Sequence, residues 1–344
     1  MSVKFVHFAG IDVSKSKIDV CLLLADGTSQ PQYGCFDQSN KGFACLKKWL
    51  LSLLGKLGIK ELLVCIENTG HYNDAILYYL EAQQIGVCLE NAANIKRSVR
   101  DVRGKSDKKD AYDIARYIKL HCDEVRLWEK PRAVVSELKQ LLAQRRRLIS
   151  TLRGLKQPLK EKSFYKWSRD TTKVKDYSAG IKGLEKDIKD IDQAIHNLAK
   201  EDEPIKRQVQ LITSIPSVGP ITAYHLICYT NEFKNVMSGK QLASYCGVAP
   251  FPRTSGSSIR IPARVSHLAN KVLKALLHMC ALTAVKMKNS FGAYFQNKTA
   301  KGKNKMLVIN ALRNKIILTI VAVVQKGQPF DKNYIYPHNN LEKP

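Results

Sequence analysis

Three aspartates at a spacing of three residues place the strongest constraint on how this chain can fold. Asp107, Asp110 and Asp113 follow Ser106 within the segment 104–113. Residues three apart share one face of a helix, and Ser106 is a favourable N-cap, so a helix with an acidic face is expected to start there. The other side is expected to face a core through apolar residues at helical spacing: Ala111, Ile114, Ala115 and Ile118. Carboxylates held this close repel one another, and a divalent metal ion is a suitable counter-ion.

Two earlier acidic residues stand at the ends of short apolar segments. Asp12 lies in Gly-Ile-Asp-Val-Ser-Lys and Glu67 lies in Glu-Asn-Thr-Gly, and each follows a run that is typical of a strand. Both acids are therefore candidates to complete a metal site with the acidic helix. The alternative is that the three aspartates form a solvated helix face beside Lys105, Lys108 and Lys109.

The first 122 residues predict a mixed α/β domain. Strands are expected over 5–24 (two, joined at 14–17), 32–36, 62–66 and 87–90, and helices over 41–54 and 73–83, with a basic connection at 94–100 into the acidic helix. An aspartate on the first strand, a glutamate ending a later central strand and aspartates on a helix resemble a ribonuclease-H-like (RuvC-like) layout. Sites of that kind use two metal ions about 4 Å apart to cleave phosphodiesters.

The charge of the chain favours a polyanionic partner. Lys and Arg number 56 against 30 Asp and Glu, a net charge of +26, and residues 205–344 have 20 basic and 3 acidic residues, a net charge of +17. Nucleic acid is the simplest such partner, because basic side chains that bind its phosphates release counter-ions. The heaviest phosphate contacts are therefore expected in the C-terminal part.

The nine cysteines indicate a reducing compartment. They are scattered, with no Cys-x-x-Cys pair and no zinc-finger spacing. The N-terminus lacks the apolar core of a signal peptide, and the longest apolar run, around 316–324, is too short to span a bilayer. The protein is therefore expected to be intracellular, with no membrane partner.

Heptad spacing marks residues 134–198. Leu and Ile recur at alternating steps of three and four in the runs 138–159 and 181–198, which predicts two long coiled-coil helices. They are expected to pack as a hairpin within one chain or against another protomer, with a tip at 163–178. The expected parts of the chain are a RuvC-like domain at 1–128, a coiled-coil hairpin at 129–204, a mostly helical domain at 205–330 and a tail at 331–344.

One candidate phosphate contact lies in residues 212–222. The sequence Ile-Pro-Ser-Val-Gly-Pro in this segment resembles a helix-hairpin-helix turn, in which backbone N–H groups at a helix N-terminus bind phosphates. Ser217 and Gly219 are the candidate residues. An ordinary connector between two helices is the alternative, because Pro and Gly occur in turns of any purpose.

A second candidate lies in residues 247–260, which are rich in Pro, Gly and Ser and are expected to form a loop. Arg253, Arg260 and Arg264 are expected to surround its serines. A serine among arginines fits a phosphate ligand or a nucleophile, and a plain surface turn is the alternative.

Together these motifs resemble those of the DEDD transposases of the insertion-sequence 110 class, which includes the 1111 subgroup. The N-terminal motifs contain Asp12, Glu67, Asp107 and Asp110, and the C-terminal ones are Ile-Pro-Ser-Val-Gly-Pro, Tyr-Cys-Gly-Val-Ala-Pro and Ser-Gly. The resemblance covers nearly the whole chain. It implies that these four acids bind two Mg²⁺ ions, or Mn²⁺ in their place, whereas Asp113 lies outside the quartet.

The resemblance also implies a second catalytic group and several partners. Ser255 matches the serine nucleophile of the C-terminal transposase domain, and Ser257 and Ser258 are its rivals. Similar proteins are recombinases that pair donor and target DNA through a noncoding bridge RNA. We therefore expect those nucleic acids, and a homo-oligomer, as partners in the nucleoid of a prokaryotic cytoplasm. The Ser255 loop is expected to fold against Asp12 and Glu67, in the same chain or a partner protomer, when DNA is bound.

The chain departs from the class after the serine loop. Where a Ser-x-x-Gly-Asn-x-x-x-Arg run is expected, this chain has Ser266, Ala269, Asn270 and Lys274. Lysine keeps the positive charge but lacks the bidentate fork of arginine, so the phosphate contact expected at Lys274 has a different geometry.

Three other functions fit parts of the sequence. A RuvC-like nuclease that activates water would need the same acids but would form no covalent intermediate. The first hairpin also resembles the phosphate loop of actin-like ATPases, although no later glycine-rich adenosine loop is found in the sequence. An architectural DNA-binding protein would explain the charge but not the ordered acids.

Overall fold

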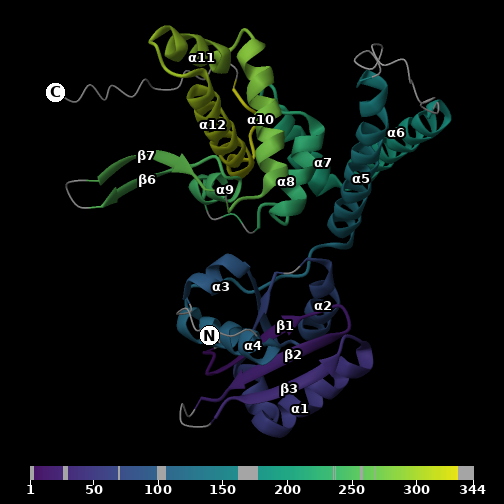
Figure 1. Ribbon diagram of the computed structural model, residues 1–344, viewed down its shortest axis with the longest axis vertical. Helices are drawn as coiled ribbons and strands as arrows, with labels where there is room; N and C mark the ends of the chain where they lie inside the picture. The colour runs from purple at the N-terminus through teal and green to yellow at the C-terminus, as the bar shows by residue number, and fades with distance from the viewer. Residues whose placement is uncertain are drawn as a thin grey trace, which may run out of the picture. The chain divides into compact units, whose positions relative to one another are not determined.

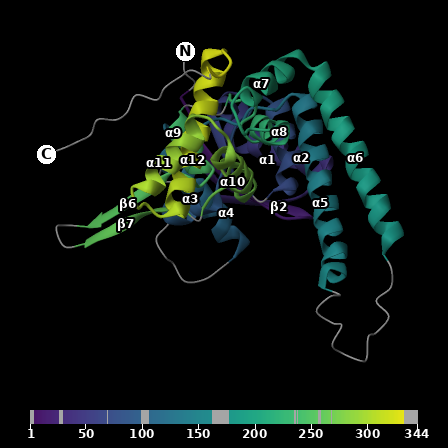
Figure 2. The same cartoon turned by 90° about the horizontal axis from the view of Figure 1, so that it is seen from above.

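The computed structural model divides the chain into two compact units, Met1–Lys130 and Pro131–Pro344. Figures 1 and 2 show the secondary structure of both units in two views. The structure describes residues 4–25, 30–68, 70–98, 106–161, 177–234, 236, 238–255, 259–266 and 268–331.

The first unit is built on a five-stranded mixed sheet. Its strands are β1 (His7–Val13), β2 (Lys17–Leu23), β3 (Gln32–Asp37), β4 (Leu62–Glu67) and β5 (Gly86–Glu90), in the spatial order β3-β2-β1-β4-β5. The first three strands form an antiparallel meander, and β4 and β5 run parallel to β1. The continuous apolar run of β4 is buried, as expected for a central strand. The predicted strands are confirmed.

Helices cover both faces of this sheet (Figure 1). On one face, α1 (Asn40–Gly58) and α2 (Asp74–Ala82) contribute Phe43 and Leu77 to a core shared with the strands. On the other face, α3 (Ala92–Ser98) and α4 (Asp107–His121) contribute Ile95 and Ile114. The sequence predicted only a basic connection where α3 forms, because a helix of seven residues is too short to show a periodic pattern.

The second unit is mostly helical. It begins with α5 (Ala133–Glu161) and α6 (Ser178–Glu201), which pack side by side as a hairpin in both views (Figures 1 and 2). Leu138 and Ile195 of the predicted heptads are fully buried, so the hairpin forms within one chain. The predicted tip lies mostly outside the described residues, since 162–176 are not described.

Six further helices complete the second unit. They are α7 (Glu203–Thr213), α8 (Pro220–Tyr229), α9 (Gly239–Tyr245), α10 (Lys271–Lys286), α11 (Ser290–Ala300) and α12 (Lys305–Lys326). They share one core with the start of α5 and the end of α6. The mixed α/β N-terminal part and the mostly helical remainder agree with the fold class expected from the sequence.

The segment predicted as a loop over 247–260 is instead largely a two-stranded ribbon. Strands β6 (Pro250–Ser255) and β7 (Ile259–Val265) pair antiparallel and extend away from the helices of the second unit in both views. A ribbon of two strands has no central strand, so it tolerates the prolines that argued against a strand. The β-branched residues of β7 alternate with other residue types and favour the extended backbone.

Helix α12 is long and apolar enough, by length and composition alone, to cross a membrane, with a mean hydropathy of 1.9. This differs from the expectation of an apolar run too short to span a bilayer, because the helix extends well before residue 316. Half of its most apolar window is buried in the protein, and Leu312, Ile316 and Ile320 are fully buried in the core of the second unit. These contacts are those of a core helix.

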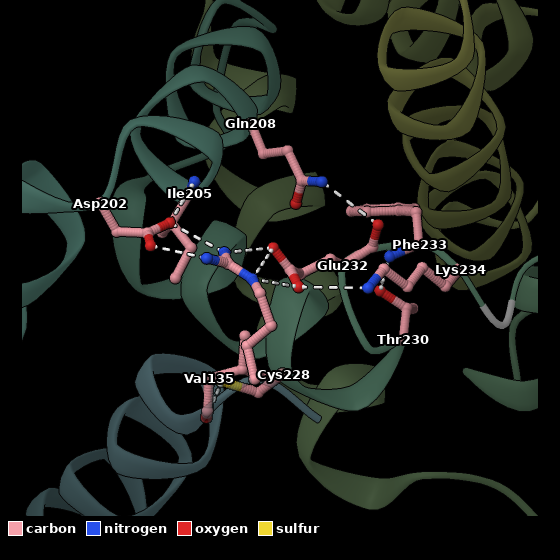
Figure 3. Close-up of polar contacts among 10 residues, drawn as sticks. Val135, Asp202, Ile205, Gln208, Cys228, Thr230, Glu232, Phe233 and Lys234 are labelled. Atoms are coloured by element: carbon pink, nitrogen blue, oxygen red, sulfur yellow. Dashed lines mark hydrogen bonds and ion pairs between the residues drawn. The ribbon is translucent and has the colours of Figure 1, made fainter. Parts of the chain in front are cut away.

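A cluster of ionic contacts ties the start of α5 to the rest of the second unit (Figure 3). The Arg132 guanidinium donates to both carboxylate oxygens of Asp202, at 2.7 and 2.8 Å, and its Nε donates to Glu232 at 2.9 Å. Asp202 also caps α7 by accepting from the backbone N–H of Ile205. The hydrogen bonds from Arg132 hold the pKa of the Asp202 carboxyl below its usual value.

This cluster also stabilises a strained turn. Asn231, Glu232 and Phe233 have φ values of 48°, 58° and 63°, in the left-handed region that side chains other than glycine seldom adopt. Such strain persists where surrounding contacts over-determine the backbone. Gln208 donates to the Glu232 carbonyl at 3.2 Å, and Thr230 accepts from the Phe233 N–H at 3.0 Å (Figure 3).

We expect Arg132→Met to destabilise the second unit by about 3 kcal/mol, because the buried Glu232 carboxylate would lose the Arg132 hydrogen bonds and be left with the more distant Lys234 ammonium at 4.0 Å. The side chain of Glu232 is only 5% exposed, whereas that of Arg132 is 36% exposed. Because one partner is partly in contact with solvent, the expected loss of stability lies at the low end of the range for buried ion pairs. The measurement is the urea midpoint for loss of helical circular dichroism.

The matched control is Lys206→Met, which removes a charge from the exposed pair between Lys206 and Glu203. It should leave the midpoint almost unchanged.

The stability of the second unit should also depend on pH. Because the pKa of Asp202 is lowered, the contribution of Asp202 to stability is present above the ordinary carboxyl pKa and is lost as pH falls toward the lowered value. This loss of stability at acid pH should be smaller in Arg132→Met. If the urea midpoint depended on pH equally in the variant and the wild type, the account would be contradicted.

Candidate active site

The first hairpin brings two aspartates together. Asp12 of β1 lies directly opposite Asp19 of β2 in the antiparallel register. Residues opposite one another in such a pair point to the same face, with Cβ atoms about 5 Å apart. Asp19 is 9% exposed, so the hairpin holds a buried carboxylate next to Asp12. The sequence analysis missed Asp19, although a tight turn at 14–17 already places residues 12 and 19 opposite each other.

The end of the next strand adds a third carboxylate. Ile66 of β4 pairs with Ile11 of β1, so Glu67 follows at the position beside Asp12. The buried side chain of Asn73 donates to the Glu67 carbonyl at 2.8 Å and fixes the end of the strand.

Glu90 ends the neighbouring strand and pairs with Glu67. Its carboxylate accepts hydrogen bonds from the Tyr117 hydroxyl at 3.1 Å, the Asn94 amide at 2.8 Å and the Asn91 N–H at 2.7 Å. These bonds engage both of its oxygens, so Glu90 anchors the chain next to the quartet.

Helix α4 lies so close to β1 that a side chain at Gly10 has no room. A Cβ atom at Gly10 would lie 2.2 Å from the Ala111 carbonyl oxygen and 2.3 Å from the Ala115 nitrogen, so only glycine fits. Ser106 caps the helix by accepting from the Lys109 N–H, as predicted. The contact at Gly10 lies two residues before Asp12 and sets the first turn of α4 beside it.

The four predicted acids are brought within electrostatic reach of one another. The pKa of the Asp12 carboxyl is raised, first by burial and then by the negative charges of Asp110, Glu67 and Asp107. The pKa of the Asp113 carboxyl is likewise raised first by burial, while the charge of Lys109 lowers it and that of Asp110, alone among the quartet, raises it. The arrangement gathers carboxylates from β1, β4 and α4 at one edge of the sheet.

The donor set of these acids suits a hard divalent cation. All four contribute carboxylate oxygens, which Mg²⁺ and Mn²⁺ prefer, and buried carboxylates that repel one another are stabilised by such an ion. Among the described residues, however, no three His, Cys, Asp or Glu side chains lie close enough together to hold a metal ion. The four carboxylates therefore lie in one region of the fold without forming a complete metal-binding group.

A lysine that the sequence analysis did not single out lies among these acids. Lys17 Nζ is 2.7 Å from an Asp107 carboxylate oxygen and 2.9 Å from an Asp19 carboxylate oxygen. Lys17 and Asp107 are 90 residues apart in the chain, and no local pattern signals their contact.

The predicted nucleophile lies at the end of the ribbon. Ser255 is the last residue of β6 and pairs with Ile259, and Arg260 pairs with Thr254. Residues 256–258, including the rival serines, lie outside the described residues.

The predicted arginines are spread along the ribbon. Arg253 pairs with Ile261 near the outer end, whereas Arg264 pairs with Phe251 at the base. At a rise of about 3.4 Å per residue, Arg264 is about 17 Å along β7 from Ile259. The backbone therefore does not place all three arginines around Ser255.

The base of the ribbon is fixed by Asn270. Its side chain caps α10 by accepting from the Val272 and Leu273 N–H groups and donates to the Tyr245 hydroxyl at 3.1 Å. A Cβ at Gly247, which has φ 64°, would lie 2.4 Å from Ala269 Cβ and 3.5 Å from Lys274 Cδ. Lys274 thus lies beside the segment that leads into β6.

The segment 214–219 forms a turn between α7 and α8, which fits both the predicted helix-hairpin-helix turn and its alternative, an ordinary connector. Ser217 adopts φ 77°, and its buried hydroxyl oxygen has no hydrogen-bond partner in the described part of the chain. Gly219 is the N-cap of α8 and is followed by Pro220. The backbone of Gly219 hydrogen-bonds the buried Cys280 thiol and so works against the rise in the pKa of that thiol that burial causes. Phosphate binding by Ser217 and Gly219 stays a prediction.

Comparison with known proteins identifies the family. Residues 9–162 match the model of the DEDD transposases of the IS110 family, described as a transposase, and residues 209–296 match the model described as the transposase IS116/IS110/IS902 family. The chain belongs to the IS110 family of transposases. It is therefore a DNA transposase, an enzyme whose substrates are DNA and whose family implies dependence on a divalent metal ion.

Named relatives agree with this assignment. The chain is 28% identical over 335 residues to the pilin gene-inverting protein of Moraxella lacunata, covering 94% of this chain and 98% of the relative. It is 26% identical over 260 residues to the transposase for insertion sequence element IS1533 of Leptospira borgpetersenii, covering 68% of this chain and 72% of the relative.

We expect Gly10→Ala to impair this transposase by moving α4 away from β1. The added methyl group cannot be accommodated 2.2 Å from a carbonyl oxygen, and overpacking of this kind costs about 1–3 kcal/mol. A shift of the helix by about 1 Å would also lower strand cleavage by on the order of a hundredfold. Thermal unfolding and a DNA cleavage assay measure the two effects.

Gly183→Ala is the matched control, because nothing lies within 4 Å of a Cβ at Gly183 in α6. It should raise stability slightly, by about 0.5–1 kcal/mol at most, since alanine is the better helix former. Full activity and stability in Gly10→Ala would show that α4 is not held by this contact.

Proposed function

We propose that this transposase cuts and rejoins DNA strands with two metal ions, Mg²⁺ or Mn²⁺ in their place, held by Asp12, Glu67, Asp107 and Asp110. The observation that carries this proposal is geometric: Glu67 ends the strand parallel to β1, beside Asp12, and α4, whose first turn contains Asp107 and Asp110, packs on β1. Residues distant in the sequence are thus collected into one negatively charged site. Bound metal ions would supply a means to activate the attacking oxygen and to stabilise the leaving one.

The topology of the sheet supports a RuvC-like, ribonuclease-H-like assignment of this domain. The order β3-β2-β1-β4-β5, with an antiparallel meander followed by parallel strands, puts Asp12 on the first strand and Glu67 on its parallel neighbour. Asp107 and Asp110 then come from the helix that packs across β1. The chain order of the acids and their place in the fold agree.

We infer further that the reaction keeps the energy of the cleaved phosphodiester. The relative from Moraxella lacunata is named for gene inversion, a process that requires cut ends to be rejoined. A serine ester can store that energy. The Ser255 hydroxyl gives up its proton as its oxygen forms a bond to phosphorus, the bond from phosphorus to the leaving strand breaks, and the leaving oxygen takes up a proton. A hydroxyl of the new strand reverses these steps.

The basic residues of the second unit are proposed to hold the DNA during this exchange. Arg253 and Arg260 would neutralise phosphates near Ser255, and Arg264, Lys274 and the turn at Ser217 and Gly219 would bind the backbone further away. The ribbon would approach Asp12 and Glu67 when DNA is bound, from the same chain or from a partner protomer.

The RNA partner, the oligomeric state and the domain boundaries within the chain are also proposals. We propose that a noncoding bridge RNA guides donor and target DNA, and that the protein acts as a dimer or tetramer in the nucleoid of a prokaryotic cytoplasm. The second unit would then contain a coiled-coil hairpin at 129–204 and a transposase domain at 205–330.

Asp110→Asn is expected to abolish strand cleavage in Mg²⁺, with a loss on the order of a thousandfold, while the metal-free protein stays folded. The variant removes a charged oxygen donor and one repulsion on Asp12. Asp113→Asn is the matched control one turn further along α4, outside the quartet, and should change cleavage only a few-fold. Cleavage that persists in Asp110→Asn would remove Asp110 from the site.

The role of Ser255 separates recombination from hydrolysis. Trapping the reaction with DNA and digesting it should give a DNA–peptide adduct on Ser255, and Ser255→Ala should lose both the adduct and strand exchange. Ser257→Ala and Ser258→Ala are the controls and should keep both. An adduct on either of those residues, or exchange by Ser255→Ala, would contradict the assignment, whereas cleavage without any adduct would support a nuclease that uses water.

A further inference from the structure

Lys17 occupies the position of a cation at the acidic edge of the first unit. Its ammonium lies 2.9 Å from Asp19 and 2.7 Å from Asp107, and so joins the hairpin to the first residue of α4. The ammonium is charged at neutral pH, as that of any lysine with an ordinary pKa is. The lysine therefore places a positive charge beside the carboxylates of this site.

The two partners of Lys17 differ in their surroundings. The Asp19 side chain is 12% exposed, whereas that of Asp107 is 56% exposed. A buried carboxylate that loses its counter-ion is costly, and an exposed one can exchange its partner at little cost. The bond between Lys17 and Asp19 is therefore the more permanent of the two, and the bond to Asp107 is the one that can be released.

The position of Asp19 makes this exchange relevant to the active site. Asp19 lies opposite Asp12, so an ammonium bound to Asp19 is next to the quartet without being part of it. The Asp107 oxygen that binds this ammonium is directed toward Lys17, and the described acids have not converged into a metal-binding group. The Lys17 ammonium thus partly neutralises the acidic site and keeps the Asp107 carboxylate directed toward Lys17.

We propose that Lys17 is a positioning residue that acts as an internal counter-ion, which a divalent metal ion displaces from Asp107. This inference deepens the proposed function and rests on its metal site. In the metal-free protein Lys17 stabilises the gathered carboxylates, and on metal binding Asp107 exchanges the ammonium for the metal while Lys17 stays on Asp19. Lys17 therefore lowers the affinity for metal and raises the stability of the metal-free protein.

If the ion pair between Lys17 and Asp107 had a purely structural role, removing Lys17 would have the opposite effect on the affinity for metal. If Lys17 held Asp107 in the orientation that the metal requires, removing it would scatter the quartet and weaken metal binding. The sign of the change in affinity thus separates the two roles, and it requires no DNA and no catalytic assay.

The experiment uses the full chain, freed of nucleic acid by a high-salt wash and titrated with MnCl₂ by electron paramagnetic resonance or calorimetry. Lys17→Met keeps the length of the side chain and removes its charge. It should bind Mn²⁺ about five- to tenfold more tightly than the wild type, which corresponds to the modest energy of one partly exposed ion pair. Lys17→Arg keeps the charge and should bind as weakly as the wild type.

Lys15→Met is the matched control. Lys15 is exposed in the turn of the same hairpin, and its loss changes the net charge by the same amount. It should leave the affinity for Mn²⁺ within about twofold of the wild type, because exposed charges are screened over a Debye length. A difference between Lys17→Met and Lys15→Met therefore reports the local contact with Asp107.

Thermal unfolding gives a second readout. The metal-free Lys17→Met protein should unfold at a lower temperature than the wild type, and Mn²⁺ should raise its unfolding temperature by more. Unchanged or weaker Mn²⁺ binding in Lys17→Met would overturn the inference and leave the metal site intact. Absence of Mn²⁺ binding by wild type, Lys17→Met and Lys17→Arg alike would overturn the proposed metal site itself.

Discussion

The contact between β1 and α4 at Gly10 is the constraint on which the candidate site depends. Without a Cβ at this position, the helix backbone lies directly on the strand. The contact is stabilised by apolar burial, since Ala111, Ile114 and Ile118 are 0–1% exposed. Each buried isoleucine contributes about 1.5–3 kcal/mol. The charges of Asp110, Glu67 and Asp107 oppose this packing, because they disfavour the ionised form of Asp12. Packing therefore holds the acids together against a charge repulsion that a cation would relieve.

The second unit meets a different electrostatic problem. Between Phe233 and Phe330 the sequence has 16 Lys and Arg residues and no Asp or Glu. The acids of the unit that the structure places in ion pairs precede this segment, as in the cluster of Arg132, Asp202 and Glu232. That cluster fixes the helices by buried ionic contacts, whereas the segment that bears the ribbon carries positive charge in excess. Such an excess attracts phosphates and steers nucleic acid toward the unit.

Local patterns predicted the elements whose signals lie within one segment. The apolar runs of β1 and β4, the Ser106 cap and the helical spacing of Ala111 and Ile114 all correspond to observed contacts. The ribbon was missed, because Pro and Ser in its strands resemble a loop and no neighbouring strand reveals the pairing. Helix α3 was missed because it is short.

The long-range ionic contacts could not have been predicted from local patterns. Lys17 and Asp107 are 90 residues apart, and Arg132 and Glu232 are 100 residues apart. Nothing near either residue in the sequence specifies its partner. Only the folded backbone brings these groups together. The acids of the quartet could be named as candidates from the sequence, because Asp12 and Glu67 lie at or next to the ends of strands and Asp107 and Asp110 lie in the first turn of a helix.

The most direct measurement is anomalous diffraction from crystals of the full chain soaked in MnCl₂. Two manganese peaks about 4 Å apart, coordinated by Asp12, Glu67, Asp107 and Asp110, are expected. Asp107 should then be released from Lys17, and Lys17 should remain on Asp19. Manganese bound elsewhere, at Asp113 for example, or no ordered manganese at the four acids, would contradict the view that these residues form the metal site of this transposase.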